Sequence, residues 1–248
     1  YKEAGYDAFK FRPGTDWKHA GMTLNKYVPM LEKLREAVGP DFRLMHEGLG
    51  MNLGSLEAII TDFAPVLEEL GFYWFEEAFG GPQYEHIDLF IRLREALPSV
   101  RVSGGERFRD RFETQEWLDR QALDIVQTDC NVTGITENWH IARMAHLRGI
   151  TLIPHNWHGG GTTMGNAHLV AAIPNREYCE LNQTYNPLKW ELFKDPYPIA
   201  DGVLPIPDKP GYGVELIDDI AEKFPWNPGP YYKPNPVFAG HDLPIWWS

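Results

Sequence analysis

The sequence alternates short apolar runs with amphipathic segments of helical period, and this alternation repeats along most of the chain. Such a pattern is typical of βα units, in which parallel strands pair side by side and helices cover the sheet. We predict seven strands. Their ranges are Asp7–Phe11, Phe42–His46, Phe72–Phe75, Val100–Ser103, Asp124–Gln127, Thr151–Pro154 and Glu177–Leu181.

Two of the intervening helices have clear boundaries. The first covers Leu24–Val38, with apolar residues at helical spacing, and it ends before Gly39-Pro40. The second follows a capping residue at Ser55, has an apolar stripe over Leu56–Leu70 and ends at Gly71. Helices of this length between strands favour a parallel sheet.

Seven parallel strands are one fewer than the eight that close a parallel α/β barrel. The chain begins at Tyr1, without Met, and enters a strand by Asp7, so we expect the first barrel strand to lie outside this sequence. We therefore predict a (β/α)8-type, TIM-like barrel in which residues 1–184 supply strands two to eight. Residues 185–248 are rich in Pro, Trp and Tyr, which predicts a C-terminal segment that packs over a neighbouring surface.

Composition and net charge limit the classes of protein to which this chain can belong. A chain of 248 residues with 43% hydrophobic residues fits one globular barrel domain. A formal charge of −12 argues against a nucleic-acid partner, and we find no apolar run long enough to cross a membrane. Cys130 and Cys179 could form one disulfide, but two scattered thiols are not a disulfide framework, and we expect reduced thiols in a cytoplasmic protein.

Polar residues stand at the carboxyl end of every predicted strand, where barrels of this type carry their chemistry. They are Lys10 and Arg12, Glu47, Glu76 with Glu77, Glu106, Asp129, His155 and Glu180. From Glu47 onward they recur at intervals of 23 to 30 residues, which is one βα unit each. We therefore expect these side chains to form one ring at the mouth of the barrel.

The three glutamates Glu47, Glu76 and Glu106 come from consecutive units. Carboxylates crowded at one mouth repel each other, and a cation relieves that repulsion. Oxygen ligands with room left for water and substrate favour Mg2+, whereas zinc favours His or Cys. The alternative is that one or more of the three forms an ordinary salt bridge in the barrel.

Asp129 and His155 follow adjacent predicted strands, so a hydrogen bond between them is geometrically easy. A carboxylate bound to one imidazole nitrogen fixes the tautomer and raises the basicity of the other nitrogen. This pair predicts a general base, although His155 could instead be structural and His158 competes with it. With Mg2+, Lys10 and Arg12 would give the mouth a small positive charge, suited to one substrate carboxylate.

Taken together, these stretches resemble the enolase superfamily, and specifically its mandelate racemase-like branch. The matching stretches are Ala8-Phe9-Lys10-Phe11-Arg12, Leu44-Met45-His46-Glu47, Trp74-Phe75-Glu76-Glu77, Ser103-Gly104-Gly105-Glu106, Asp124-Ile125-Val126-Gln127-Thr128-Asp129, Gly134-Ile135-Thr136-Glu137, Pro154-His155, Glu180 and Pro207-Asp208-Lys209-Pro210-Gly211-Tyr212-Gly213-Val214. The resemblance covers roughly residues 5 to 216. Its strength lies in the order and spacing of the stretches.

The resemblance implies a modified (β/α)7β barrel and an N-terminal capping domain, which this chain lacks and on which residues 185–248 would also pack. It implies that Glu47, Glu76 and Glu106 bind Mg2+ and that Asp129 and His155 form the acid/base pair. Lys10 and Glu180 would contact the substrate carboxylate. Specificity would then lie largely outside the chain.

Two departures from the family pattern bear on the reaction. Glu47 stands where the family usually has Asp, and Arg12 stands where racemases of this branch place a second Lys base. Arginine stays protonated in proteins, so it binds anions but is a poor proton acceptor. A single base, His155, suffices for dehydration. We therefore predict a Mg2+-dependent acid-sugar dehydratase that forms a 2-keto-3-deoxy acid.

Racemisation, epimerisation or cycloisomerisation would use the same His155 and Mg2+, and these stay open as alternatives. A glycoside hydrolase barrel would also carry carboxylates at strand ends, but it needs neither three in consecutive units nor an Asp–His pair. A silent binding module is a further alternative. For the predicted dehydratase we expect a small carboxylate, an acid sugar, as substrate, and a homo-oligomer.

Overall fold

A computed structural model describes residues 1–13, 17–49, 51–80, 86–183, 187–195, 197 and 199–226. Within these residues it forms one parallel sheet of six strands, arranged in chain order. The strands are β1 (Ala8–Phe11), β2 (Arg43–Glu47), β3 (Trp74–Glu76), β4 (Arg101–Gly104), β5 (Ile125–Val126) and β6 (Thr151–Leu152). Glu47 pairs in register with Glu76, so the ends of β2 and β3 lie side by side.

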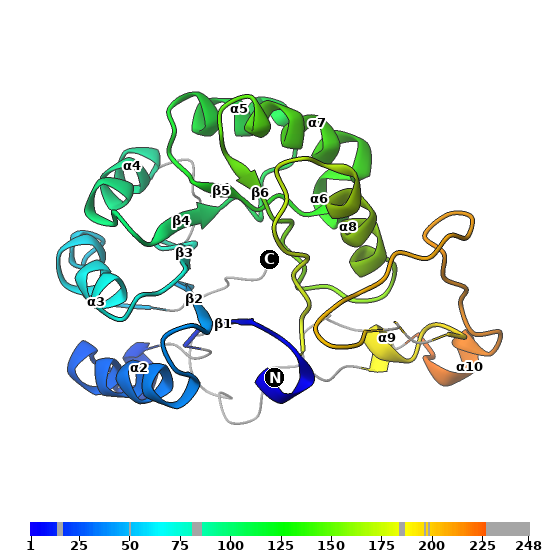
Figure 1. Ribbon diagram of the computed structural model, residues 1–248, viewed down its shortest axis with the longest axis horizontal. Coiled ribbons are helices and arrows are strands. Elements are labelled where there is room, and N and C mark those ends of the chain that lie inside the picture. Colours follow the sequence, from blue (N-terminus) through cyan, green and yellow to red (C-terminus); the bar gives the residue numbers. More distant parts are fainter. Residues whose placement is uncertain are drawn as a thin grey trace.

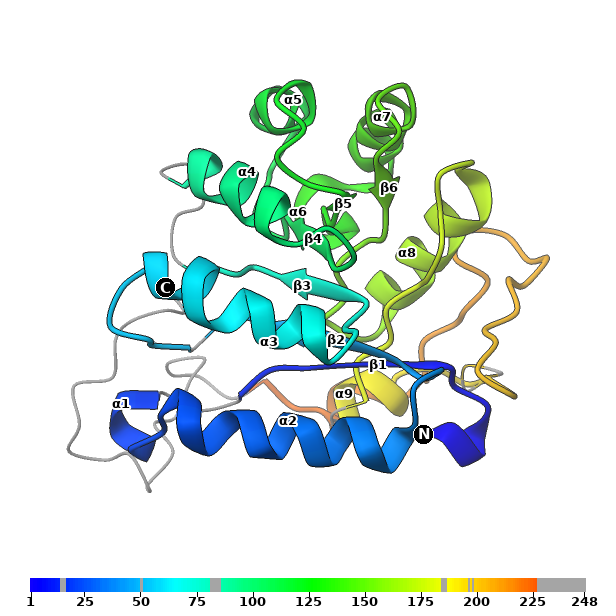
Figure 2. The same ribbon diagram turned by 60° about the vertical axis from the view of Figure 1, so that its left-hand side comes forward.

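Helices cover one face of this sheet. The longer ones are α2 (Leu24–Val38), α3 (Ala64–Glu69), α4 (Ile87–Ala96), α5 (Arg111–Asp119), α7 (Ile135–His146) and α8 (Gly161–Ala172). Figure 1 shows the strands on the inside of an arc, with α2, α3, α4, α5 and α7 outside it. Figure 2 shows α2 and α3 running alongside the strands next to them. This arrangement confirms the predicted TIM-barrel-like α/β fold.

Short elements complete the described chain. They are the 3-10 helix η1 (Lys2–Ala4), the π-helix η2 (Ile59–Phe63), α1 (Trp17–Ala20), α6 (Cys130–Thr133), α9 (Pro187–Trp190) and α10 (Ile220–Lys223). Helix α2 has the predicted bounds. The second predicted helix is divided into η2 and α3, and Ser55 accepts the N–H of Ala58 through its hydroxyl at 3.2 Å.

The period of two along each strand decides which side chains face the helices and which face the barrel interior. Leu44 and Phe75 are fully buried in the core between sheet and helices. Met45 and Trp74, one position away on each strand, belong to a separate inner cluster with Ile125 and Ile153. The same alternation places Glu47 and Glu76, two positions after Met45 and Trp74, on the inner face.

The predicted strand at Glu177–Leu181 is wrong. These residues lie within the described range 86–183, and the structure assigns no strand to them. In the described chain, one main-chain hydrogen bond joins this region to β6. The N–H of Leu152 donates to the carbonyl of Asn175 at 2.9 Å. An apolar run shows that a segment is buried, but a strand requires successive main-chain bonds to a neighbour.

The described part of the C-terminal segment packs on the barrel. A Cβ atom at Gly159 would lie 1.9 Å from the Cγ atom of Lys189, so that glycine makes room for the lysine stem. The Tyr197 hydroxyl donates to the carbonyl of Gly160. The proposed boundary at residue 184 and the tail from residue 227 lie outside the described residues, so the division into two parts stays a prediction.

Two further predictions concern membrane-spanning segments and the two cysteines. Among the residues that the structure describes, no helix has both the length and the apolar character needed to span a bilayer. Cys130 and Cys179 are both free thiols in the described chain. Burial raises the pKa of each thiol to about 12, so both are in the neutral SH form at neutral pH.

Candidate active site

The carboxyl ends of the strands open into a cavity of about 1430 Å3. Seven of the eight side chains predicted for the site line it: Lys10, Arg12, Glu47, Glu106, Asp129, His155 and Glu180. The eighth, Glu76, is fully buried and contacts Lys10. The structure therefore brings the predicted ring together from β1, β2, β3 and the segments after β4, β5 and β6.

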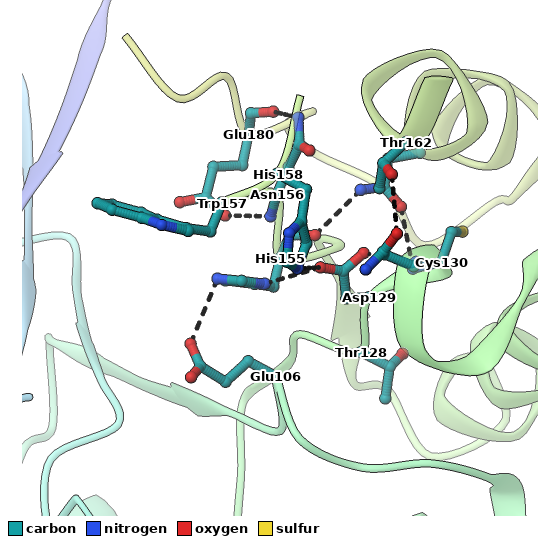
Figure 3. A network of polar contacts seen from close by, with 12 residues as sticks. Glu106, Thr128, Asp129, Cys130, His155, Asn156, Trp157, His158, Thr162 and Glu180 are labelled. Atoms are coloured by element: carbon teal, nitrogen blue, oxygen red, sulfur yellow. Dashed lines mark hydrogen bonds and ion pairs between the residues drawn. The ribbon is translucent and has the colours of Figure 1, made fainter. Parts of the chain in front are cut away.

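Asp129 and His155 form the predicted pair. Nδ1 of His155 lies 2.9 Å from Oδ2 of Asp129, which is completely buried. The other Asp129 oxygen accepts the main-chain N–H of Asn131 at 2.8 Å. A carboxylate held in this way accepts a hydrogen bond from Nδ1–H of His155. The Nε2 atom then faces the cavity, where it lies 3.3 Å from Oε2 of Glu106 (Figure 3).

The environment of His155 favours its protonated form. Burial lowers the pKa of the imidazole, but the hydrogen bond to Asp129 and the charges of Glu180 and Glu106 outweigh burial and raise it to about 9. The competing His158 is more exposed, and its Nε2 atom lies 3.7 Å from Asp129. The geometry therefore favours His155 over His158 as the partner of Asp129.

Lys10 lies among carboxylates. Its ammonium contacts Glu76 and lies 2.7 Å from Oε1 of Glu180. Burial lowers the pKa of Lys10, but Glu180, Glu76 and Glu47 together raise it well above the usual value. Lys10 is therefore a permanent cation at neutral pH, as a residue that binds a carboxylate must be.

Arg12 lies at the edge of the same group. Its Nη1 atom is 3.4 Å from Oε1 of Glu47, and its guanidinium lies 4.4 Å from the centre of the Trp157 ring. Stacking on an aromatic ring and pairing with a carboxylate are both typical of a guanidinium that remains charged. These contacts agree with an anion-binding function for Arg12.

The three predicted metal ligands fit Mg2+ in kind, since all are carboxylates at one mouth. Burial raises the pKa of Glu47 to about 7, and the charges of Glu76 and Glu106 add to that rise. This mutual repulsion is what a bound cation would relieve. Within the described part of the chain, however, no three such side chains are arranged to hold an ion, and each contacts a basic residue instead. The metal assignment stays a prediction.

Two residues with a clear structural function in the site were not assigned one from sequence. Glu77 has a positive φ of 48°, and its Oε1 atom accepts the N–H of Gly105 at 2.8 Å and of Glu106 at 3.3 Å. It thereby fixes the main chain that carries Glu106. Asn156 is completely buried and bonds to Glu180. In the sequence, each of the two is a polar residue directly next to a predicted site residue. Its side chain points away from the cavity.

The fold and the site together define a TIM-barrel-like α/β domain with a polar site at the carboxyl ends of its strands. The family model described as "Enolase C-terminal domain-like" matches residues 1–220, and the chain belongs to this family. The assignment to the enolase superfamily made from sequence is confirmed.

Relatives within this family match most of this chain but are themselves longer. An arabinonate dehydratase of Saccharolobus solfataricus is 34% identical over 90% of this chain and 58% of its own length. A D-galactarolactone cycloisomerase of Agrobacterium fabrum is 30% identical over 82% of this chain and 54% of its own. The crystal structure of the 3,6-anhydro-D-galactonate cycloisomerase of Zobellia galactanivorans superposes with a TM-score of 0.78 at 29% identity, covering 90% of this chain and 60% of that one. This chain thus spans a little more than half of these relatives.

Proposed function

We propose that the protein is a Mg2+-dependent acid-sugar dehydratase, a hydro-lyase that converts a polyhydroxy monocarboxylate into a 2-keto-3-deoxy acid. The observation that carries the proposal is the hydrogen bond between buried Asp129 and partly buried His155, with the Nε2 atom of His155 at the cavity and the cation Arg12 where racemases place a second base. One base and an anion-binding arginine suit elimination better than two-sided proton exchange.

The residues of this chain would divide the reaction as follows. The neutral form of His155, which a pKa of about 9 makes the minor form at pH 7, accepts the proton on the carbon next to the carboxylate, and Asp129 stabilises the imidazolium that results. The imidazolium then donates a proton to the departing β-hydroxyl on the same face. Lys10 binds the substrate carboxylate and stabilises the second negative charge that develops on it. Mg2+ on Glu47, Glu76 and Glu106 would supply further positive charge at that carboxylate.

Cycloisomerisation is a second candidate, because two of the relatives are named as cycloisomerases. It would use the same His155 and the same ion but release no water. Racemisation or epimerisation would require a second base, which Arg12 does not provide. Family membership does not favour a glycoside hydrolase or a silent binding module, and both give distinct outcomes in the assay below.

The test is incubation of the full-length protein with Mg2+ and a library of acid sugars, with 2-keto acid formation as the readout. We expect turnover of at least one aldonate, abolished by EDTA and restored by Mg2+. Rearrangement without 2-keto acid would indicate cycloisomerisation. Hydrolysis of a glycoside in the presence of EDTA, or binding without any turnover, would contradict the proposal. A homo-oligomer and a cytoplasmic location stay predictions.

A further inference from the structure

Asn156 donates three hydrogen bonds from a completely buried position directly after His155. Its main-chain N–H donates to Oε2 of Glu180 at 2.7 Å, and its Nδ2 donates to the main-chain carbonyl of Glu180 at 2.8 Å. Nδ2 also lies 3.0 Å from Oγ1 of Thr163. One residue therefore holds both the side chain and the main chain of Glu180, as Figure 3 shows for the Asn156–Glu180 contacts.

Glu180 needs such a contact because of where it lies. It belongs to the segment 177–181, which forms no strand in the described chain. The main-chain bond of this region to β6 is at Asn175, five positions before Glu180. In a regular sheet, main-chain bonds would fix the position of a strand-end residue. Here the side-chain amide of Asn156 supplies a bond of that kind.

The position of Glu180 affects its neighbours in the site. Its Oε1 atom lies 2.7 Å from Nζ of Lys10, while Oε2 accepts the Asn156 N–H. A shift of this carboxylate would change the charge around Lys10, whose ammonium also contacts Glu76. The two oxygens of Glu180 are thus divided between a cation of the site and the residue next to the base.

We propose that Asn156 is a positioning residue that holds Glu180 against Lys10 in the geometry the reaction requires. The inference rests on the proposed function in one respect, because Glu180 is assigned there to the carboxylate end of the substrate. Asn156 itself touches no reacting atom. It acts through Glu180, and its effect should therefore disappear when Glu180 no longer carries a carboxylate.

The first test needs no substrate. Asn156→Leu keeps a similar side-chain volume and the main-chain N–H, but it removes the side-chain amide that bonds to the Glu180 carbonyl. We therefore expect hydrogen exchange of the main-chain N–H groups in residues 177–183 to accelerate by about tenfold or more. Thr163→Val is the matched control, because it removes the hydroxyl next to Asn156 but leaves both bonds to Glu180. Unchanged exchange in Asn156→Leu, or equal acceleration in both variants, would overturn the inference. If Asn156→Leu does not fold, Asn156→Ser replaces it.

The second test is a double-mutant cycle on turnover of an acid sugar. Asn156→Leu should lower kcat/KM by about 10- to 100-fold, as is usual for residues that orient a site group. The loss should divide between kcat and KM in the same proportion as in Glu180→Gln. In the Glu180→Gln background, Asn156→Leu should cost less than about threefold. Multiplicative losses, or a different division between kcat and KM, would show that Asn156 acts independently of Glu180.

The two tests separate the two proposals. If the parent protein turns over no acid sugar, the proposed function fails, and hydrogen exchange still decides whether Asn156 holds the Glu180 segment. If the parent is active but the cycle shows no coupling, the function stands and the inference about Asn156 is wrong.

Discussion

The Nδ1 atom of His155 lies 2.9 Å from Oδ2 of Asp129, although 26 positions separate the two residues in the chain. The contact exists because β5 and β6 pair in parallel, with Val126 opposite Leu152, so the residues that follow the two strands emerge side by side. A fully buried Asp129 then has the imidazole as its cationic partner. This relationship underlies the mechanism proposed above.

Replacing His155 with Asn should stop two processes together. Because His155 is the proposed single base, both exchange of the α-proton in deuterated water and formation of the 2-keto acid should fall by about 10²- to 10⁴-fold. NMR of the substrate measures the exchange, and a keto-acid assay measures the product. His146→Asn, at an exposed position in the last turn of α7, is the control and should retain parental rates. Exchange that persists without product would assign the base to another residue.

Replacing Arg12 with Lys tests whether the arginine prevents two-sided chemistry. Lysine can lose its proton where neighbouring positive charge lowers its pKa, whereas arginine cannot. We expect Arg12→Lys to gain exchange of the opposite α-epimer, and Arg12→Ala to lose substrate binding or turnover without that gain. Deuterium incorporation into both epimers is the measurement. Parental exchange of both epimers at similar rates would remove the main support for dehydration.

Replacing Glu76 with Gln should abolish metal-dependent turnover while the fold stays intact. The change removes one of three proposed oxygen ligands, so Mg2+ affinity measured by calorimetry should fall at least about tenfold. In the parent, affinity should rise as pH increases through about 7, because burial raises the pKa of Glu47 to that value and a ligand must be deprotonated. Glu57→Gln, an exposed residue paired with Arg92, is the control. Unaltered affinity in Glu76→Gln would contradict the metal assignment.

The pKa of His155 can be measured directly by NMR titration of the metal-free protein. We expect about 9, because the Asp129 hydrogen bond and the Glu180 and Glu106 charges outweigh the effect of burial. Asp129→Asn should lower it. A folded pKa above the unfolded value of about 6.5 stabilises the fold fully below pH 6.5, and this contribution is lost as pH rises through about 9.

The corresponding stability measurement compares urea unfolding of the parent and His155→Gln. The parent's advantage in the free energy of unfolding should shrink between pH 6 and pH 10, by at most about 3 kcal/mol. An advantage independent of pH would show that the imidazolium is not stabilised in the folded protein.

The sequence by itself determined the order of the strands, the helices over them and the positions of the candidate site residues. It could do so because burial imposes a period of two on strands and of 3.6 on helices, and a βα unit fixes the interval between strand ends. The bounds of α2 and the inward direction of Glu47 and Glu76 follow from these periods. Departures at single positions, such as Arg12, were also visible in the sequence.

Only the tertiary structure decided how the remaining chain supports the site. The segment Glu177–Leu181 has the composition of a strand, yet it forms none in the described chain, because pairing depends on a neighbour and not on the segment's own residues. The contacts of Asn156 with Glu180, and of Glu77 with the N–H groups of Gly105 and Glu106, cross 24 to 29 positions. Such contacts have no sequence period, because long-range packing alone brings their partners together.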